Sequence, residues 1–153
     1  MKNYLTLAAV LSAFFFIAAP QASAHCEVPC GIFSDDNVIK ELHVTQQTIA
    51  KSMVLINELS KDPSKNANQL TRWVMTKENH AIKIQNTMLQ YFLAQRIKLA
   101  EMESDKESYL NKLTLAHKVI VLAMKSKQTT DEKTANALHD AIHAFEKAYA
   151  AKK

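Results

Sequence analysis

Apolar residues recur every three or four positions from residue 34 onward, the spacing that places side chains on one face of an α-helix. Four stretches carry this pattern: residues 35–59, about 67–102, and two more that follow residues 104 and 129. Their stripes are Val38, Leu42, Ile49, Met53, Ile56 and Leu59; Leu70, Val74, Ala81, Ile84, Met88 and Tyr91, interrupted by Lys77; Leu110, Leu113, Ala116, Ile120 and Met124; and Ala135, Leu138, Ile142, Phe145 and Tyr149.

Turn and capping signals separate these stretches. Pro63 ends the first, because proline lacks a backbone donor and disfavours helix in the residue before it. Ser104 with Glu107, and Thr129 with Glu132, have the spacing of capping boxes, so a helix should start at each. The sequence therefore predicts an all-α fold, an antiparallel up-and-down four-helix bundle over residues 34–153.

The first 24 residues have the pattern of a cleaved secretory signal peptide. Lys2 precedes an apolar run from Leu5 to Ala19, and Ala22-Ser23-Ala24 forms a small-residue cleavage site. The alternative, a membrane anchor, needs about 20 apolar residues, and this run is shorter. We expect a signal peptidase or another maturation protease to cut after Ala24. The mature protein would then be periplasmic, secreted or in another extracytoplasmic lumen, without stable membrane association.

The charge pattern restricts the partners. Nineteen lysines and arginines against fifteen acids give a formal net charge of +4, and the charges are interspersed along the chain. This pattern argues against a nucleic-acid surface. A small positive excess would still favour encounters with a small anion.

Cleavage after Ala24 would leave His25 as the N-terminal residue, with Cys26 beside it and Cys30 four residues further on. Three interpretations stay open. The thiols could form a disulfide in an oxidising compartment. A structural zinc site would lack the usual second Cys or His pair. The terminal amine, the Cys26 amide and both thiolates could instead form a planar four-donor set, which favours Ni(II) or Cu(II).

The run His-Cys-x-x-Pro-Cys-Gly at a processed N-terminus resembles the nickel hook of the nickel superoxide dismutase family. The resemblance implies a four-helix bundle assembled as a homohexamer, with one nickel ion per subunit. It implies disproportionation of superoxide to dioxygen and hydrogen peroxide by Ni(II)/Ni(III) cycling. We call residues 25–33 the hook, between the signal peptide (1–24) and the bundle (34–153).

The resemblance also implies roles for individual hook residues. His25 would supply its amine and an axial imidazole, Cys26 its amide and thiolate, and Cys30 its thiolate. These three would be both metal ligands and catalytic residues. Pro29 would fix the turn, in the family through a cis bond, and Gly31 would let the backbone turn out of the hook.

Other family positions are matched less closely. Glu27 and Val28 would line the substrate pocket. Phe33 stands where the family usually has a tyrosine, so that hydroxyl is missing here. Tyr91 is a looser match to a second family tyrosine near the metal.

Two residues would act on the metal through the axial imidazole. Glu41 stands at the position of a family glutamate that hydrogen-bonds this histidine. That glutamate often pairs with an arginine, and His80 occupies the aligned position here. Without the family, both would be ordinary helix residues.

The remaining histidines give weaker signals. His139 and His143 are four apart and could share a metal, but they directly follow core positions and more simply line the edge of a stripe. His43 and His117 have no partner in the sequence. A di-iron bundle would need two Glu-x-x-His motifs, which this chain lacks.

The family resemblance does not exclude other functions. A secreted nickel or copper carrier could use the same hook without turnover. A disulfide-closed helical adaptor would need no metal at all.

Overall fold

The computed structural model describes residues 34–151. The predicted signal peptide and hook, including Ala24, His25, Cys26, Cys30 and Phe33, therefore lie outside the described residues. The elements are α2 (Asp35–Leu59), α3 (Pro63–Asn86), the π-helix η1 (Thr87–Arg96), α4 (Glu101–Ser104), α5 (Lys106–Gln128) and α6 (Glu132–Ala150).

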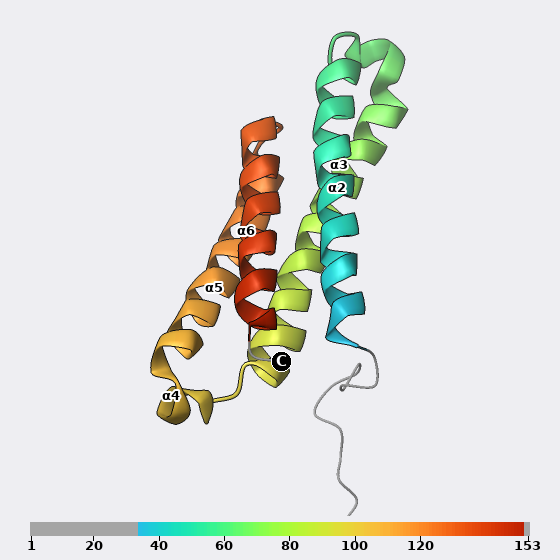
Figure 1. The fold of residues 1–153 in the computed structure, drawn as a ribbon. Helices are drawn as coiled ribbons and strands as arrows, with labels where there is room; N and C mark the ends of the chain where they lie inside the picture. The colour runs from blue at the N-terminus through green and yellow to red at the C-terminus, as the bar shows by residue number, and fades with distance from the viewer. Residues whose placement is uncertain (1–33, 152–153) are drawn as a thin grey trace, which may run out of the picture.

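Four long helices form a closed ring, in which α2 packs on α3, α3 on α5, α5 on α6, and α6 back on α2. Successive helices run in opposite directions, and the α2–α3 turn reaches beyond the α5–α6 pair (Figure 1). The predicted all-α bundle is confirmed. None of the helices in residues 34–151 combines the length and apolar character needed to cross a bilayer.

The core contains most of the predicted stripes of α2 and α6, together with Ala81, Ile84 and Met88 of the second predicted stripe. Ile49, Met53, Leu138, Ile142 and Phe145 are at most 1% exposed. These stripes could be predicted from the sequence because polar residues flank them on both sides, which leaves one apolar face on each helix to be buried.

The stripe predicted for α5 is only partly right. Ala116 is fully buried as predicted, and Leu113 and Ile120 pack partly buried against the core. Leu110, however, is 45% exposed, and the unpredicted Val119 and Ala123 are buried. The buried face of α5 was not recognised in the sequence because it contains two polar residues. Lys112 is buried because it pairs with Glu101, and the buried Ser126 hydroxyl donates to the Leu122 carbonyl.

Lys77 interrupts the apolar row of α3 because its ammonium serves the end of another helix. The buried Nζ donates to the carbonyls of Ser126 at 2.8 Å and Lys127 at 2.5 Å, and it lies 3.0 Å from Glu78 Oε1. The last carbonyls of an α-helix lack intrahelical partners and carry partial negative charge. The lysine thus caps α5 and joins it to α3.

The second predicted helix, residues 67–102, has different bounds in the structure. It begins earlier, at Pro63, because proline is well suited to the first helical position, and Asp62 accepts from the Lys65 amide. Its α-helical part ends at Asn86 and continues as η1, which closes with Ile97 N–H donating to the Phe92 carbonyl at 2.9 Å. No proline or glycine marks this change, so the periodicity continued through it.

Two caps also lie one or two residues beyond the predicted ones. Asp105, not Ser104, accepts from the Ser108 amide at the start of α5. Asp131, not Thr129, accepts from the Lys133 amide at the start of α6. Both helices nevertheless begin close to where the capping boxes placed them.

Candidate functional site

The hook joins the bundle at the end where α2 begins, because residues 25–33 directly precede Ser34. The first turn of α2, the π-helix η1 and the last turn of α6 meet at this end (Figure 1). Among the side chains that join these three elements, that of Asp35 lies two residues after the hook.

Asp35 is the centre of this junction and is only 3% exposed. Its Oδ1 accepts from the Tyr91 hydroxyl at 2.5 Å. Its Oδ2 accepts from Arg96 Nη2 at 2.7 Å and from the Tyr149 hydroxyl at 2.9 Å. We call these four residues the Asp35 cluster. A buried carboxylate with three donors is well satisfied, so the cluster fixes the start of α2 against η1 and α6.

The environment sets the charge of each member. Burial favours the neutral carboxyl of Asp35, but the hydrogen bonds from Arg96, Tyr91 and Tyr149 outweigh it and lower the pKa to about 2. Burial and the bond to Asp35 raise the pKa of Tyr91 to about 12. At neutral pH Asp35 is therefore an anion and Tyr91 a neutral donor.

Tyr91, predicted to line the substrate pocket, is 4% exposed, and its hydroxyl points to Asp35. The Arg96 guanidinium lies 5.7 Å from the centre of its ring, and Phe92 packs edge-on against it at 5.1 Å. These contacts hold the tyrosine rigidly. Its role beside a metal stays a prediction.

Glu41 and His80, the predicted pair behind the axial imidazole, have other partners in the described bundle. Glu41 is exposed, and its Oε1 lies 2.5 Å from Lys83 Nζ. His80 is half-buried, with Nδ1 2.8 Å from the Thr76 carbonyl. The contact of Glu41 with His25, like its pairing with His80, stays a prediction.

Sequence reasoning missed Asp35, Arg96 and Tyr149 as a unit. An aspartate in a first helical turn and an arginine in a last turn both suit the helix dipole, so neither attracts notice. Tyr149 fits an apolar stripe. A weak signal existed, since Asp35 is the first helical residue after the hook, but only the packing of three helices brings its donors to it.

Asp35→Asn should destabilise the bundle by about 2–4 kcal/mol, because it leaves the Arg96 guanidinium without its anion. Urea unfolding followed by circular dichroism measures this change. Asp36→Asn, the adjacent exposed acid, is the matched control and should cost about 0.3–1 kcal/mol.

The same substitution should change the acid stability of the protein. The pKa of Asp35 is lower in the folded protein than in the unfolded chain. Its contribution, about 2 kcal/mol, is therefore present above pH 4 and lost as the pH falls through 2. Asp35→Asn should flatten stability in this window. Equal slopes in both proteins would show that Asp35 is not held as an anion.

Comparison with known proteins agrees with the family resemblance of the sequence. The sequence matches the family model described as nickel-containing superoxide dismutase over residues 20–153, which includes the hook and the whole described bundle. No curated protein and no solved structure gives a significant match.

Proposed function

The chain belongs to the nickel-containing superoxide dismutase family, and from this premise we propose that the hook of the processed chain holds the catalytic nickel. The family is defined by an oxidoreductase activity on superoxide and by its nickel cofactor. The observation that carries the proposal is that the match begins before His25 and runs through both cysteines.

The donor chemistry of the hook fits nickel. His25 contributes an amine and an imidazole, Cys26 an amide nitrogen and a thiolate, and Cys30 a second thiolate. Square-planar nitrogen and sulfur ligands select Ni(II) or Cu(II) over metals that prefer oxygen. Strong donation from thiolates and a deprotonated amide stabilises the higher oxidation state. Held by these donors, nickel would supply Ni(II)/Ni(III) redox chemistry.

In the net reaction, two superoxide anions and two protons give dioxygen and hydrogen peroxide. Nickel supplies the one-electron chemistry, and the residues of this chain position the metal and admit the anion. Glu27 and Val28 would line the approach, and His25 would hold the metal through its amine and imidazole. The Asp35 cluster would hold the base of the hook fixed at Ser34, so that the donors need not be ordered anew in each cycle.

A secreted nickel or copper carrier with the same hook is the alternative. Metal analysis of the mature protein, combined with a superoxide-consumption assay, separates the two functions. The enzyme should contain about one nickel per chain and consume superoxide catalytically. A carrier would hold metal without turnover, and a disulfide-closed adaptor would hold none.

The proposal includes removal of the signal peptide, residues 1–24. Cleavage after Ala24 by a signal peptidase or another maturation protease would place the mature enzyme in a periplasm, another extracytoplasmic lumen or the medium. The sequence of residues 1–24 supports this placement.

Glu41→Ala should lower activity by roughly 10–100-fold if the carboxylate orients the axial imidazole. The matched control is Lys83→Ala, which removes the partner of Glu41 in the described bundle and leaves the carboxylate in place. The nickel spectrum should change in the first variant and not in the second. The same small effect in both would show that Glu41 only forms a surface ion pair.

Assembly into a homohexamer would cover apolar residues that one chain leaves exposed. Trp73, Phe92 and Ile97 lie outside the predicted stripes and would be candidates for this role; Phe92 and Ile97 are buried within the chain and cannot serve it, whereas Trp73 is half-buried. The exposed apolar residues include Met75 at 58%, Ile82 at 40% and Leu89 at 43%, seven positions apart along α3 and η1. Such a stripe supports a subunit interface.

Ile82→Glu should therefore dissociate the assembly or raise the protein concentration at which the assembly forms. Val44→Glu on α2, where Val44 is 54% exposed, is the matched control. Sedimentation velocity measures both. A wild-type protein that stays monomeric at all concentrations would contradict the assembly.

A further inference from the structure

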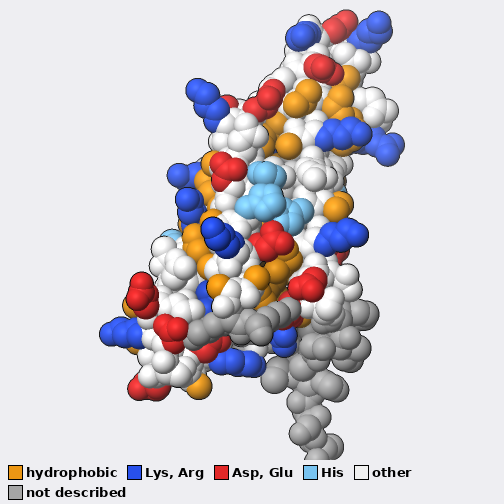
Figure 2. Space-filling view, in the orientation of Figure 1, with side chains coloured by type: hydrophobic (Ala, Val, Ile, Leu, Met, Phe, Trp, Pro, Cys, Tyr) orange, Lys and Arg blue, Asp and Glu red, His pale blue; other side chains and the backbone are white. Residues whose placement is uncertain are grey.

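A group of histidines lies on the outer face of the bundle where α2 packs against α6, around the middle of the helices (Figure 2). Its members are His43 on α2 and His139 and His143 on α6, and Glu146 on α6 lies among them. We call these four residues the histidine cluster. The proposed function uses none of them.

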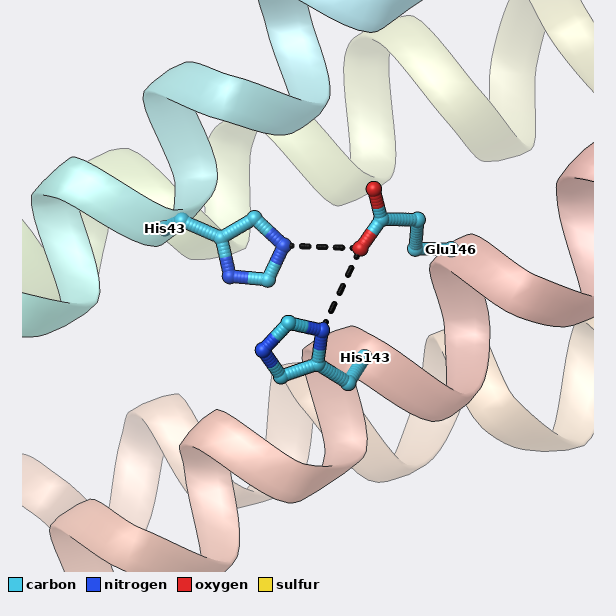
Figure 3. Close-up of side chains that lie close together, drawn as sticks. All are labelled: His43, His143 and Glu146. Atoms are coloured by element: carbon cyan, nitrogen blue, oxygen red, sulfur yellow. Dashed lines mark hydrogen bonds and ion pairs between the residues drawn. The ribbon is translucent and has the colours of Figure 1, made fainter.

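Glu146 is the point at which two imidazoles converge. Its Oε2 lies 2.9 Å from His43 Nε2 and 3.3 Å from His143 Nδ1, and both nitrogens face that oxygen (Figure 3). One ligand atom from each of the three residues lies within 4.8 Å of the other two. In a tetrahedral zinc site, with bonds of about 2.0–2.1 Å, neighbouring ligand atoms are about 3.3 Å apart. The three atoms are thus close to a ligand arrangement.

The helices explain why these side chains meet. Positions 139, 143 and 146 are one and two turns apart on α6, so they share one face. His43 directly follows the buried Leu42, as His139 and His143 follow Leu138 and Ile142. All three histidines therefore stand at the edge of a core stripe, and packing of α2 on α6 brings the two edges together. The ligands come from rigid elements, which favours a defined site.

The cluster is also accessible and rich in donors. The His43 side chain is only 18% exposed, whereas His143 is 54% and Glu146 40% exposed, so an ion can enter from solvent. The His139 ring lies 4.5 Å from the His143 ring, which puts a third imidazole beside the first two. Two of the rings contact the same Glu146 oxygen, whereas His139 Nδ1 lies 3.4 Å from the exposed carboxylate of Asp140, a weak contact that a metal could replace.

We propose that the histidine cluster is a second metal site, separate from the hook, that binds one divalent transition-metal ion of the zinc type. His43, His143 and Glu146 are the protein ligands, and His139 is the imidazole placed to complete the set. Two imidazoles and a carboxylate suit Zn²⁺, and the absence of a thiolate among them distinguishes this donor set from the hook. The ion would join α2 to α6, helices at opposite ends of the chain. The proposal does not depend on the proposed function.

Zinc titration tests the site in two proteins, the mature nickel-loaded chain and a Cys26→Ser/Cys30→Ser double variant whose hook has no thiols. Isothermal titration calorimetry should give one zinc per chain in both. Because zinc binds the folded bundle, the Tm should rise by roughly 5–10 °C at a hundredfold excess over the Kd. If the double variant binds zinc but does not consume superoxide, zinc is bound at the histidine cluster and not through the thiols of the hook.

Single substitutions locate the ion. His43→Ala and Glu146→Gln should each abolish the zinc-dependent rise in Tm while circular dichroism without zinc is unchanged. His117→Ala, at an exposed histidine of α5, is the matched control and should bind zinc normally. Cobalt(II) in the double variant should give visible ligand-field bands without thiolate charge transfer. No saturable zinc binding, or unaltered binding in both His43→Ala and Glu146→Gln, would overturn the proposal.

Discussion

Cys26→Ser or Cys30→Ser is expected to abolish both nickel redox cycling and superoxide dismutation. A serine hydroxyl is a harder and far less acidic donor than a thiol, so either substitution removes a strongly donating thiolate from the planar set. The higher oxidation state then loses its stabilisation. Superoxide consumption should fall to the rate of the uncatalysed reaction, and metal analysis of the same preparation should show whether nickel is lost or only redox-inert.

The bundle provides the internal control for this experiment. Its core lies within residues 38–145 and contains neither cysteine, so both variants should show normal helicity and an unchanged urea midpoint. Full activity in either variant would contradict the nickel assignment. Loss of the fold in either would show that the cysteines serve structure, as in a disulfide-closed adaptor.

One extra residue before His25 is expected to have an effect of similar size. In that protein the nitrogen of His25 belongs to a peptide bond and is no longer a basic amine. Two thiolates and an imidazole remain, but the planar set is incomplete. The extended protein should fold as a helical bundle and fail to hold redox-active nickel, so its superoxide consumption should approach background.

A matched control adds the same residue after Lys153, at the other end of the chain. This protein should retain nickel and activity. If the protein extended at His25 is as active as the correctly cut one, the amine is not a required ligand. Cleavage after Ala24 would then be a matter of export and not the step that creates the site.

Much of the fold was predictable because helical periodicity is local. The buried faces of α2 and α6 follow from residues three and four apart, and a few polar neighbours settle which face is buried. The same reasoning was only partly right for α5, where Ala116 is buried as predicted but Lys112 and Ser126 share the buried face and Leu110 is exposed. Burial of Lys112 is offset by its ion pair with Glu101, and burial of Ser126 by its hydrogen bond to the Leu122 carbonyl. Neither contact can be inferred from the pattern of apolar residues.

The candidate sites differ in the same way, according to whether their residues are close together in the sequence. The hook is contiguous in sequence, so its residue types and spacing could be recognised without any tertiary information. The Asp35 cluster and the histidine cluster are assembled across helices. Asp35 and Tyr149 are 114 residues apart, and His43 and Glu146 are 103 apart. Their contacts depend on the register of α6 against α2 and on the widened turns of η1, which one sequence does not reveal.

The most direct test of the account is an electron paramagnetic resonance spectrum of the mature, nickel-loaded protein with its histidines labelled with ¹⁵N. If the imidazole of His25 binds the nickel, the unpaired electron of the oxidised metal should couple to the nitrogen nucleus of that ligand. The unlabelled protein should give a triplet splitting from ¹⁴N, the labelled protein a doublet, and the signal should fall on reduction. A protein that consumes superoxide while its nickel signal is absent, or shows no change on labelling, would contradict the hook as the redox centre.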